Sequence, residues 1–278
     1  MTFRRTLVAT IGLLGILWAP HDAWSGPVFD SVMKRGSVRL GIPYNLRPQG
    51  FLTPEGEWLG FEKDLGAELA SRMNLKLEPV KVNGQTWKSM LAGGQIDAAL
   101  CRIRHTRSLD AEFDASIAYF YDSLQMLVTK GNAKTGADLK GLKIAAIQGS
   151  PAEKVAMHLL TQAGDPEAQK NVISFPDRPS CFAALGQDKV SGWVDSGMIL
   201  LEYASRSPGR FELAPVSEKV EPLAIALPQN DSAWRNVINF TIQDMAADGS
   251  LAKLYDKWFG PDTPYPFPAR RAIEIWPQ

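Results

Sequence analysis

The chain has 278 residues, of which 45% are hydrophobic and 22% are charged, so it is long enough for one large or two ordinary globular domains. Thirty basic residues balance thirty acidic residues, which excludes a strong overall charge that would attract nucleic acid or an anionic membrane. Two cysteines are too few for a zinc framework, and the sequence has no C-x-x-C motif, so we expect neither a metal nor a cofactor.

The N-terminal segment, residues 1–25, is typical of a secretory signal peptide. Two arginines precede an apolar run over residues 7–19, and small residues follow at Ala23 and Ser25. The apolar run is shorter than the roughly 18 residues expected of a membrane-spanning helix. We therefore expect cleavage after Ser25 and a mature protein that is exported to the periplasm.

The first half of the mature chain alternates between strand and helix patterns. Apolar side chains recur every fourth residue from Phe61 to Met73, which predicts an amphipathic helix. The expected elements are, in chain order, a strand at 37–42, a helix at 60–73, a strand at 75–80, a short helix within 86–95 and a strand at 96–100. This alternation indicates βαβ units and a mainly parallel sheet.

The same alternation starts again in the second half. Ser150 is a good helix N-cap, and Pro151 suits the first helical position. Two later helices are expected to break at Asp248 and Gly249, and the proline-rich residues 261–278 are expected to wrap the surface as an extended arm. The other expected elements are a strand at 142–147, a helix at 181–187, and strands at 189–195 and 221–231.

Four stretches of the mature chain carry a resemblance to a known family. They are VRLGIPYNLRPQGFLTPEGEWLGFEKDLGAELASRM, TWKSMLAGGQIDAAL, ADLKGLKIAAIQGSPAE and DGSLAKLYDKWFG, in this order behind a signal peptide. Together they are similar to the extracellular solute-binding proteins of polar amino-acid ABC importers. The proline-rich extension after Phe259 is most similar to the glutamate/aspartate-binding branch of that family.

The resemblance implies an α/β protein with the type II periplasmic binding protein fold. Two lobes would be joined by two hinge strands, with the ligand clamped between them, where domain interfaces and the ends of parallel strands favour binding sites. Lobe one would consist of residues 26–122 and 223–278, and lobe two of residues 123–222.

The resemblance also implies a function. The protein would be a periplasmic substrate-binding protein that carries a polar amino acid, with acidic amino acids among the candidates, to an inner-membrane ABC permease. We expect it to act as a monomer, to bind no nucleic acid and to have no enzymatic activity.

The loop CRIRHTR, which follows an apolar strand, is the candidate grip for the ligand α-carboxylate. In the family this loop carries hydroxyl donors and then an arginine, whose guanidinium offers two parallel donors to a planar carboxylate. Arg107 is the natural counterpart, but its spacing from Asp97 is two residues shorter than in the family. Aligned without a gap, Arg102 and Arg104 take the hydroxyl positions. The sequence leaves open which of the three arginines grips the carboxylate.

The resemblance assigns two residues of lobe two as well. Ser150 and the free N–H groups of the helix that follows match donors placed against the same carboxylate, although Ser150 equally serves as a plain N-cap. Asp195 ends an apolar strand and matches the aspartate that binds the ligand α-ammonium, while capping a helix is its alternative role. An arginine of lobe one would bind the ligand carboxylate and Asp195 of lobe two would bind its ammonium. The lobes would then close only on a ligand that carries both charges.

Fewer residues are implied in side-chain selectivity. Trp87 and Pro43 stand where the glutamate/aspartate-binding branch has charged residues, and Arg178 aligns with a selectivity position if a one-residue gap is introduced. Tyr44 and Trp87 have flat rings that can stack on a ligand, and a place in the core is the alternative for Trp87. The sequence therefore predicts a clamp without identifying its ligand.

Two other functions stay open at this point. Cyclohexadienyl dehydratases share the implied fold and use a carboxylic acid in the cleft, for which Asp195 and Glu62 are candidates. His105 is the histidine nearest the cleft, and no nucleophile is spaced to it as in a triad. Accessory proteins of periplasmic quinoprotein dehydrogenases resemble the same N-terminal stretches, but their corresponding loop lacks such a run of arginines.

The two cysteines are expected in different lobes. Cys101 lies in lobe one beside the proposed site, whereas Cys181 begins a helix in lobe two. A disulfide between them would staple the cleft, and bridged cysteines have Cα atoms within about 7 Å of each other. We therefore predict that both thiols are free.

Overall fold

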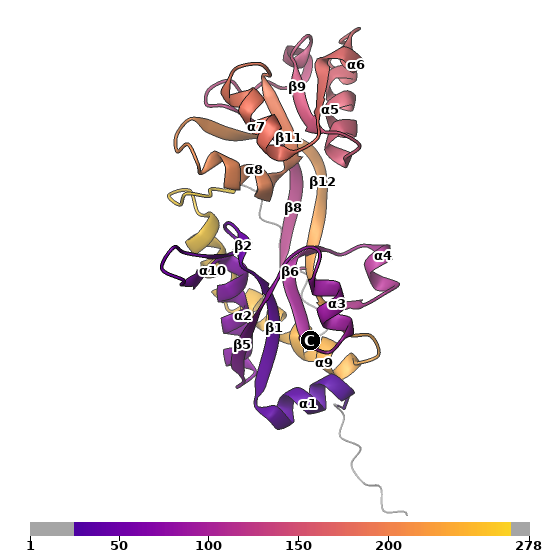
Figure 1. Cartoon of the computed structure of the whole chain (residues 1–278), viewed down its shortest axis with the longest axis vertical. Helices are drawn as coiled ribbons and strands as arrows, with labels where there is room; N and C mark the ends of the chain where they lie inside the picture. The colour runs from indigo at the N-terminus through magenta and orange to yellow at the C-terminus, as the bar shows by residue number, and fades with distance from the viewer. Residues whose placement is uncertain (1–24, 268–278) are drawn as a thin grey trace, which may run out of the picture.

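The computed structural model describes residues 25–267, which fold into two lobes connected by two long strands, β8 (Phe120–Thr129) and β12 (Phe211–Leu227) (Figure 1). The two-lobed α/β architecture expected from the sequence is confirmed. The predicted signal peptide lies, apart from Ser25, outside the described residues. Within the described part of the chain, no helix is both long and apolar enough to cross a membrane.

The first lobe contains the beginning and the end of the described chain. Its main strands are β1 (Ser37–Pro43), β5 (Lys76–Val82), β6 (Ala98–Arg104) and β7 (Asp114–Ala115), and its helices are α1 (Pro27–Arg35), α2 (Phe61–Arg72), α3 (Trp87–Ala92), α4 (Arg107–Asp110), α9 (Ser232–Ala247) and α10 (Ser250–Phe259). Strand β1 pairs in parallel with both β5 and β6, as the strand–helix–strand pattern predicted. Gly249 has a φ of 80°, a left-handed conformation that favours glycine, and it separates α9 from α10 at the predicted break.

The second lobe repeats this plan. Its strands are β9 (Ile144–Ile147), β10 (Val172–Phe175) and β11 (Gly192–Ser196), and its helices are η1 (Gly136–Leu139), α5 (Pro151–Gln162), α6 (Ala168–Asn171), α7 (Arg178–Gly186) and α8 (Gly197–Ala204). Strand β9 pairs in parallel with β10 and β11. Ser150 caps α5 by accepting a hydrogen bond from the Glu153 N–H at 3.3 Å, which confirms the predicted helix start.

One mixed sheet runs through both lobes, in the order β10-β9-β11-β8-β12-β6-β1-β5, with β7 paired to β12. In its centre β8 and β12 are antiparallel to each other, and their register shifts between Pro215 and Val220. Only the second part of β12, from residue 221, corresponds to a strand predicted from the sequence. The predicted lobe boundaries at 122–123 and 222–223 fall within these two strands.

A small antiparallel sheet follows β1. It consists of β2 (Asn45–Leu46), β3 (Gly50–Leu52) and β4 (Trp58–Leu59). The indole N–H of Trp58 donates a hydrogen bond to the carbonyl of Pro43 at 2.8 Å, which holds this sheet against the end of β1. Strands of two or three residues are too short to produce a periodic pattern in the sequence.

Each lobe buries hydrophobic clusters of its own. Phe61 and Trp234 are fully buried in the first lobe, and Trp193 is fully buried in the second. Cys101 and Cys181 are both buried free thiols, and they belong to clusters of different lobes. The first-lobe cluster also includes Met198 and Leu201 of α8, whereas the cluster around Met126 consists of second-lobe residues alone.

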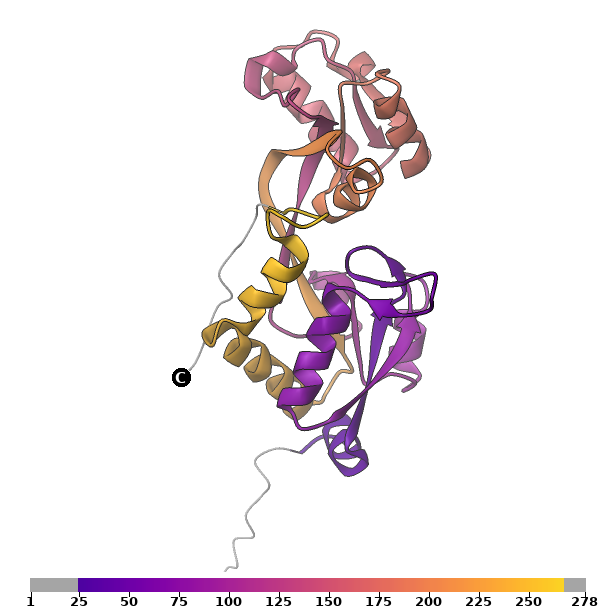
Figure 2. The same ribbon diagram turned by 90° about the vertical axis from the view of Figure 1, so that its left-hand side faces the viewer.

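The C-terminal arm links the two lobes beside the connecting strands (Figure 2). Its last described residue, Phe267, is buried and lies with its ring centroid 5.6 Å from that of Phe120. A Cβ atom added to Gly197, the first residue of α8, would stand 2.5 Å from the Phe267 ring. The arm predicted for residues 261–278 is thus present as far as residue 267, and residues 268–278 lie outside the described residues.

We predict that Gly197→Ala destabilises the protein, because the new methyl group overlaps both Phe267 and Gln125. Overpacking of this kind lowers the free energy of unfolding by about 1–3 kcal/mol. Gly186→Ala is the matched control, since a Cβ at Gly186 meets nothing within 4 Å and the residue ends helix α7. Chemical denaturation should separate the two variants, and equal stabilities would contradict the contact between the arm and α8.

Candidate ligand-binding site

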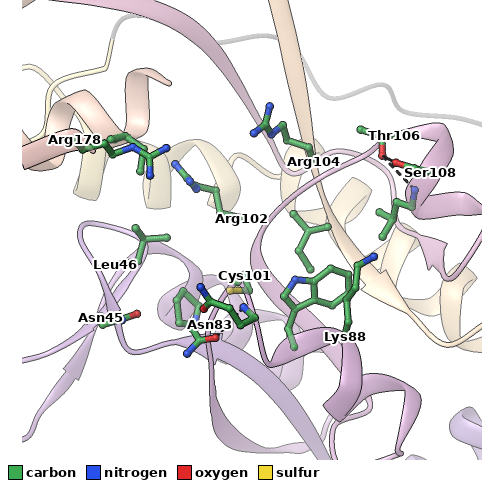
Figure 3. Close-up of a pocket in the computed structure, with 17 residues that line it drawn as sticks. Asn45, Leu46, Asn83, Lys88, Cys101, Arg102, Arg104, Thr106, Ser108 and Arg178 are labelled. Carbon is green, nitrogen blue, oxygen red and sulfur yellow. Dashed lines mark hydrogen bonds between the residues drawn. The ribbon is translucent and has the colours of Figure 1, made fainter. Parts of the chain in front are cut away.

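Two adjoining cavities lie between the lobes, one of about 590 Å³ and one of about 160 Å³, and together they form the cleft. The larger is lined mainly by β6, α3 and neighbouring loops of the first lobe. The smaller is lined mainly by the connecting strands and by residues of the second lobe that include Ser150 and Asp195. Arg102, Arg104 and Arg178 line both cavities, so positive charge from both lobes gathers where the two meet (Figure 3).

Asp195 and Arg178 form an ion pair on the second lobe's side of the cleft. Asp195 lies near the end of β11 and Arg178 is the first residue of α7, and Arg178 Nε lies 2.9 Å from Asp195 Oδ2. The other carboxylate oxygen, Oδ1, accepts the Ser196 N–H at 2.7 Å. Two residues that the resemblance assigned to separate roles, ammonium binding and selectivity, are therefore brought together in this structure.

Arg102 connects the first lobe to the second. Its backbone has a φ of 47°, a left-handed conformation that is uncommon for a residue with a side chain. Its N–H donates to Glu62 Oε1 at 2.6 Å, and Nη1 donates to the Ser196 hydroxyl at 3.2 Å. The Ser196 hydroxyl in turn donates to Asp122 Oδ2 on β8 at 2.5 Å. A continuous chain of hydrogen bonds thus runs from α2 through Arg102 to a connecting strand.

Where the sequence predicted the CRIRHTR loop, strand β6 continues to Arg104 and α4 begins at Arg107, and these two arginines occupy different surroundings. Arg104 Nη1 lies 3.0 Å from Glu221 Oε1 on β12, so this guanidinium already has a carboxylate partner. Arg107 is exposed at the start of α4 and is not among the residues that line the two cavities. A role for Arg107 in holding the ligand stays a prediction.

Of the other predicted site residues, Ser150 and Trp87 line the cleft. Ser150 lines the smaller cavity while its hydroxyl caps α5, so the capping role and access to the cleft coexist. Trp87 lines the larger cavity but is largely buried against Phe113, with ring centroids 5.3 Å apart, as the core alternative predicted. Tyr44 is half-buried with the ammonium of Lys81 6.0 Å from its ring, and it is not among the residues that line either cavity.

Asp122 and Ser196 belong to the cleft but were not predicted as site residues. Asp122 is the only charged residue of strand β8, and a charged residue within a strand pattern is a signal that the sequence does carry. Burial raises the pKa of Asp122, while the hydrogen bond from Ser196 and the positive charge of Arg102 act in the opposite direction. Ser196 follows Asp195 directly, but its position between the lobes is decided by the tertiary fold.

Glu62 is fully buried behind Arg102 of β6, and the sequence suggested for it only the role of a catalytic acid. Its Oε1 accepts hydrogen bonds from the Arg102 N–H and from the Tyr119 hydroxyl. Burial raises the pKa of Glu62 to about 7, and these two hydrogen bonds limit the rise. Glu62 does not line either cavity, so it supports Arg102 from behind rather than facing the cleft.

The described residues contain no group of three or more histidine, cysteine, aspartate or glutamate side chains that could hold a metal ion. The side chains that face the cleft and carry charge are instead those of the three arginines, Lys88, Asp122, Asp195 and Glu221. Such a set can bind a charged organic molecule by ion pairs and hydrogen bonds.

We predict that Glu62→Gln makes the protein more stable above neutral pH. A folded-state pKa of about 7, above the ordinary 4.5, means that the wild type loses stability as the pH rises through this interval. Ionisation of Glu62 lowers the free energy of unfolding by about 3 kcal/mol, and this decrease is complete above the folded-state pKa. Glutamine keeps the acceptor for Arg102 and Tyr119 and carries no charge, so the variant should lack this loss.

Unfolding free energies at about pH 5 and about pH 8 test this prediction. The difference between wild type and Glu62→Gln should grow in favour of the variant as the pH rises. Glu57→Gln, which changes an exposed glutamate of the same lobe, is the control and should follow the wild type. An identical pH dependence in wild type and Glu62→Gln would contradict the raised pKa.

Comparison with known proteins identifies the family. The model of the bacterial extracellular solute-binding proteins, family 3, matches residues 38–261. The L-cystine-binding protein TcyJ of Escherichia coli is 25% identical over 84% of this chain and 87% of its own length. The L-glutamate/L-aspartate-binding protein of Pseudomonas aeruginosa is 25% identical over 93% of this chain and 89% of its own length.

Solved structures agree with this result. An ancestral cationic amino acid solute-binding protein, AncCDT-1, is 26% identical with a TM-score of 0.69, covering 83% of this chain and 98% of that protein. The L-cystine solute receptor of Neisseria gonorrhoeae, in its unliganded open conformation, has a TM-score of 0.71 at 18% identity, covers 86% of this chain and 98% of its own, and shares the fold. The chain therefore belongs to the bacterial extracellular solute-binding proteins of family 3.

Proposed function

We propose that this protein is the periplasmic substrate-binding component of an amino-acid ABC importer and that it clamps a polar amino acid between its lobes. The observation that carries the proposal is the cleft, in which arginines of both lobes and the Asp195 carboxylate face a shared space. Relatives named for binding cystine and glutamate or aspartate support this class of ligand.

The cellular role follows from the same assignment. Residues 1–25 direct export to the periplasm, and residues 26–122 with 223–278 move as one lobe against residues 123–222. The monomer then delivers its ligand to an inner-membrane permease. Relatives whose names place them in the periplasm, such as a general L-amino acid-binding protein of Rhizobium johnstonii, support this location.

In our assignment Arg102 grips the ligand α-carboxylate. It lines both cavities, and its guanidinium is held by the Ser196 hydroxyl, whereas Arg104 is engaged by Glu221. A hydroxyl is a weaker partner for a guanidinium than a carboxylate, so a ligand carboxylate can replace it favourably. Ser150 and the N-terminal N–H groups of α5 add donors from the other lobe.

The ligand α-ammonium is assigned to Asp195, and Trp87 forms part of the wall of the larger cavity. Arg102 belongs to the first lobe and Asp195 to the second, and both line the smaller cavity, so a zwitterion bound between them holds the two lobes together. Each charge-assisted hydrogen bond contributes about 1.5–3 kcal/mol, and this gain favours the closed state. Tyr44 and Arg107, which do not line the cavities here, are predicted to contribute only after closure.

The screen that tests the proposal measures the melting temperature of the mature protein with each common amino acid at saturating concentration. A bound ligand stabilises the folded state by about 2.7 kcal/mol at a hundred times its dissociation constant. We predict a clear rise for one or more polar amino acids, and its loss in Arg102→Gln and Asp195→Asn. Arg235→Gln, a half-exposed arginine on α9 outside the cleft, is the control.

Three outcomes would contradict the proposal. No rise with any amino acid would exclude the importer role. Product formation from arogenate or prephenate would identify a dehydratase instead. Co-purification with a quinoprotein dehydrogenase, without amino-acid binding, would identify an accessory protein.

A further inference from the structure

The carboxylate assigned to the ligand ammonium is already occupied. Asp195 Oδ2 is bonded to Arg178 Nε at 2.9 Å, and Oδ1 accepts the Ser196 N–H at 2.7 Å. The Asp195 side chain is only 10% exposed, whereas that of Arg178 is 46% exposed. Because so little of Asp195 is exposed, an incoming ammonium reaches its carboxylate from the cleft by displacing the guanidinium, which is the more accessible partner of the pair.

A displaced Arg178 guanidinium would have no free carboxylate nearby. Among the described residues that line the two cavities, the other carboxylates are Glu221, which pairs with Arg104 at 3.0 Å, and Asp122, which accepts the Ser196 hydroxyl at 2.5 Å. Arg178 also shares its space with the positive charge of Arg102 (Figure 3). If the lobes closed over an unpaired Arg178, its guanidinium would lose contact with water and would be repelled by Arg102. No ion pair would compensate for these two costs.

We propose that the Arg178–Asp195 ion pair selects acidic amino acids, an inference that rests on the proposed amino-acid clamp. The ligand ammonium takes the place of Arg178 on Asp195, and the ligand's second carboxylate takes the place of Asp195 on Arg178. One ion pair is exchanged for two, while the α-carboxylate binds Arg102. Asp195, Arg178 and Arg102 then each have a partner of opposite charge on the ligand.

The same exchange excludes two related classes of ligand. A neutral amide such as glutamine displaces Arg178 but offers it no negative charge. A dicarboxylate without an ammonium leaves the Arg178–Asp195 pair closed and can use only the remaining arginine. Charge-assisted hydrogen bonds lost in this way reduce affinity by about tenfold or more.

Titration calorimetry at constant ionic strength tests the inference with L-glutamate, L-aspartate, L-glutamine, L-asparagine, succinate and glutarate. We expect each acidic amino acid to bind about tenfold or more tightly than its amide, and more tightly than the dicarboxylate of equal chain length. Arg178→Gln should remove most of this preference, since the acids lose a partner and the amides no longer compete with a guanidinium. Arg178→Lys, which keeps the charge, should retain part of it.

The control is Arg206→Gln, because Arg206 pairs with Glu202 on the surface of α8 with a comparable exposure of 49%. This variant should keep the wild-type preference. Amides that bind the wild type as tightly as acids, succinate or glutarate that bind as tightly as the amino acids, or a preference unchanged in Arg178→Gln would each overturn the inference and leave the importer role standing. Failure of every amino acid to bind would instead reject the proposed function itself.

Discussion

The antiparallel pairing of β8 with β12 is the constraint on which the two-lobed structure depends. These strands pass between the lobes and join the parallel strands of each lobe into one sheet. Their register shift between Pro215 and Val220 interrupts the regular ladder near the middle of the connection. Irregularities of this kind bend a strand and increase its twist, so this stretch is suited to absorb a change in the angle between the lobes.

The polar groups of the cleft are held from the same strands. Asp122 on β8 accepts the hydroxyl of Ser196, which in turn accepts Arg102 of the first lobe. Glu62 holds the backbone of Arg102 from the opposite side in a conformation that few side chains adopt. These few hydrogen bonds join β8 to the residue assigned to the ligand carboxylate, so in the proposed clamp a hinge motion would move both together.

Much of the fold could be predicted from the sequence, because periodic apolar residues and helix caps are local signals. The stripe from Phe61 to Leu69 predicted α2, and the cap at Ser150 predicted the start of α5. The site was harder to predict from the sequence, because the residues that interact there come from distant segments of the chain. Arg178 and Asp195 are 17 residues apart, and nothing in the sequence indicates that they pair rather than await separate ligand groups. Likewise, three arginines within six residues look alike in the sequence, whereas in the structure Arg102 and Arg104 of β6 line the cleft and Arg107 of α4 does not.

The central claim is that an amino acid closes the lobes around itself. Small-angle X-ray scattering of the mature protein measures this directly, with and without the amino acid that raises the melting temperature most. The account predicts a smaller radius of gyration with saturating ligand, and no change under the same conditions in Asp195→Asn. A radius of gyration that is unchanged in the wild type, while calorimetry shows the site to be full, would contradict the clamp.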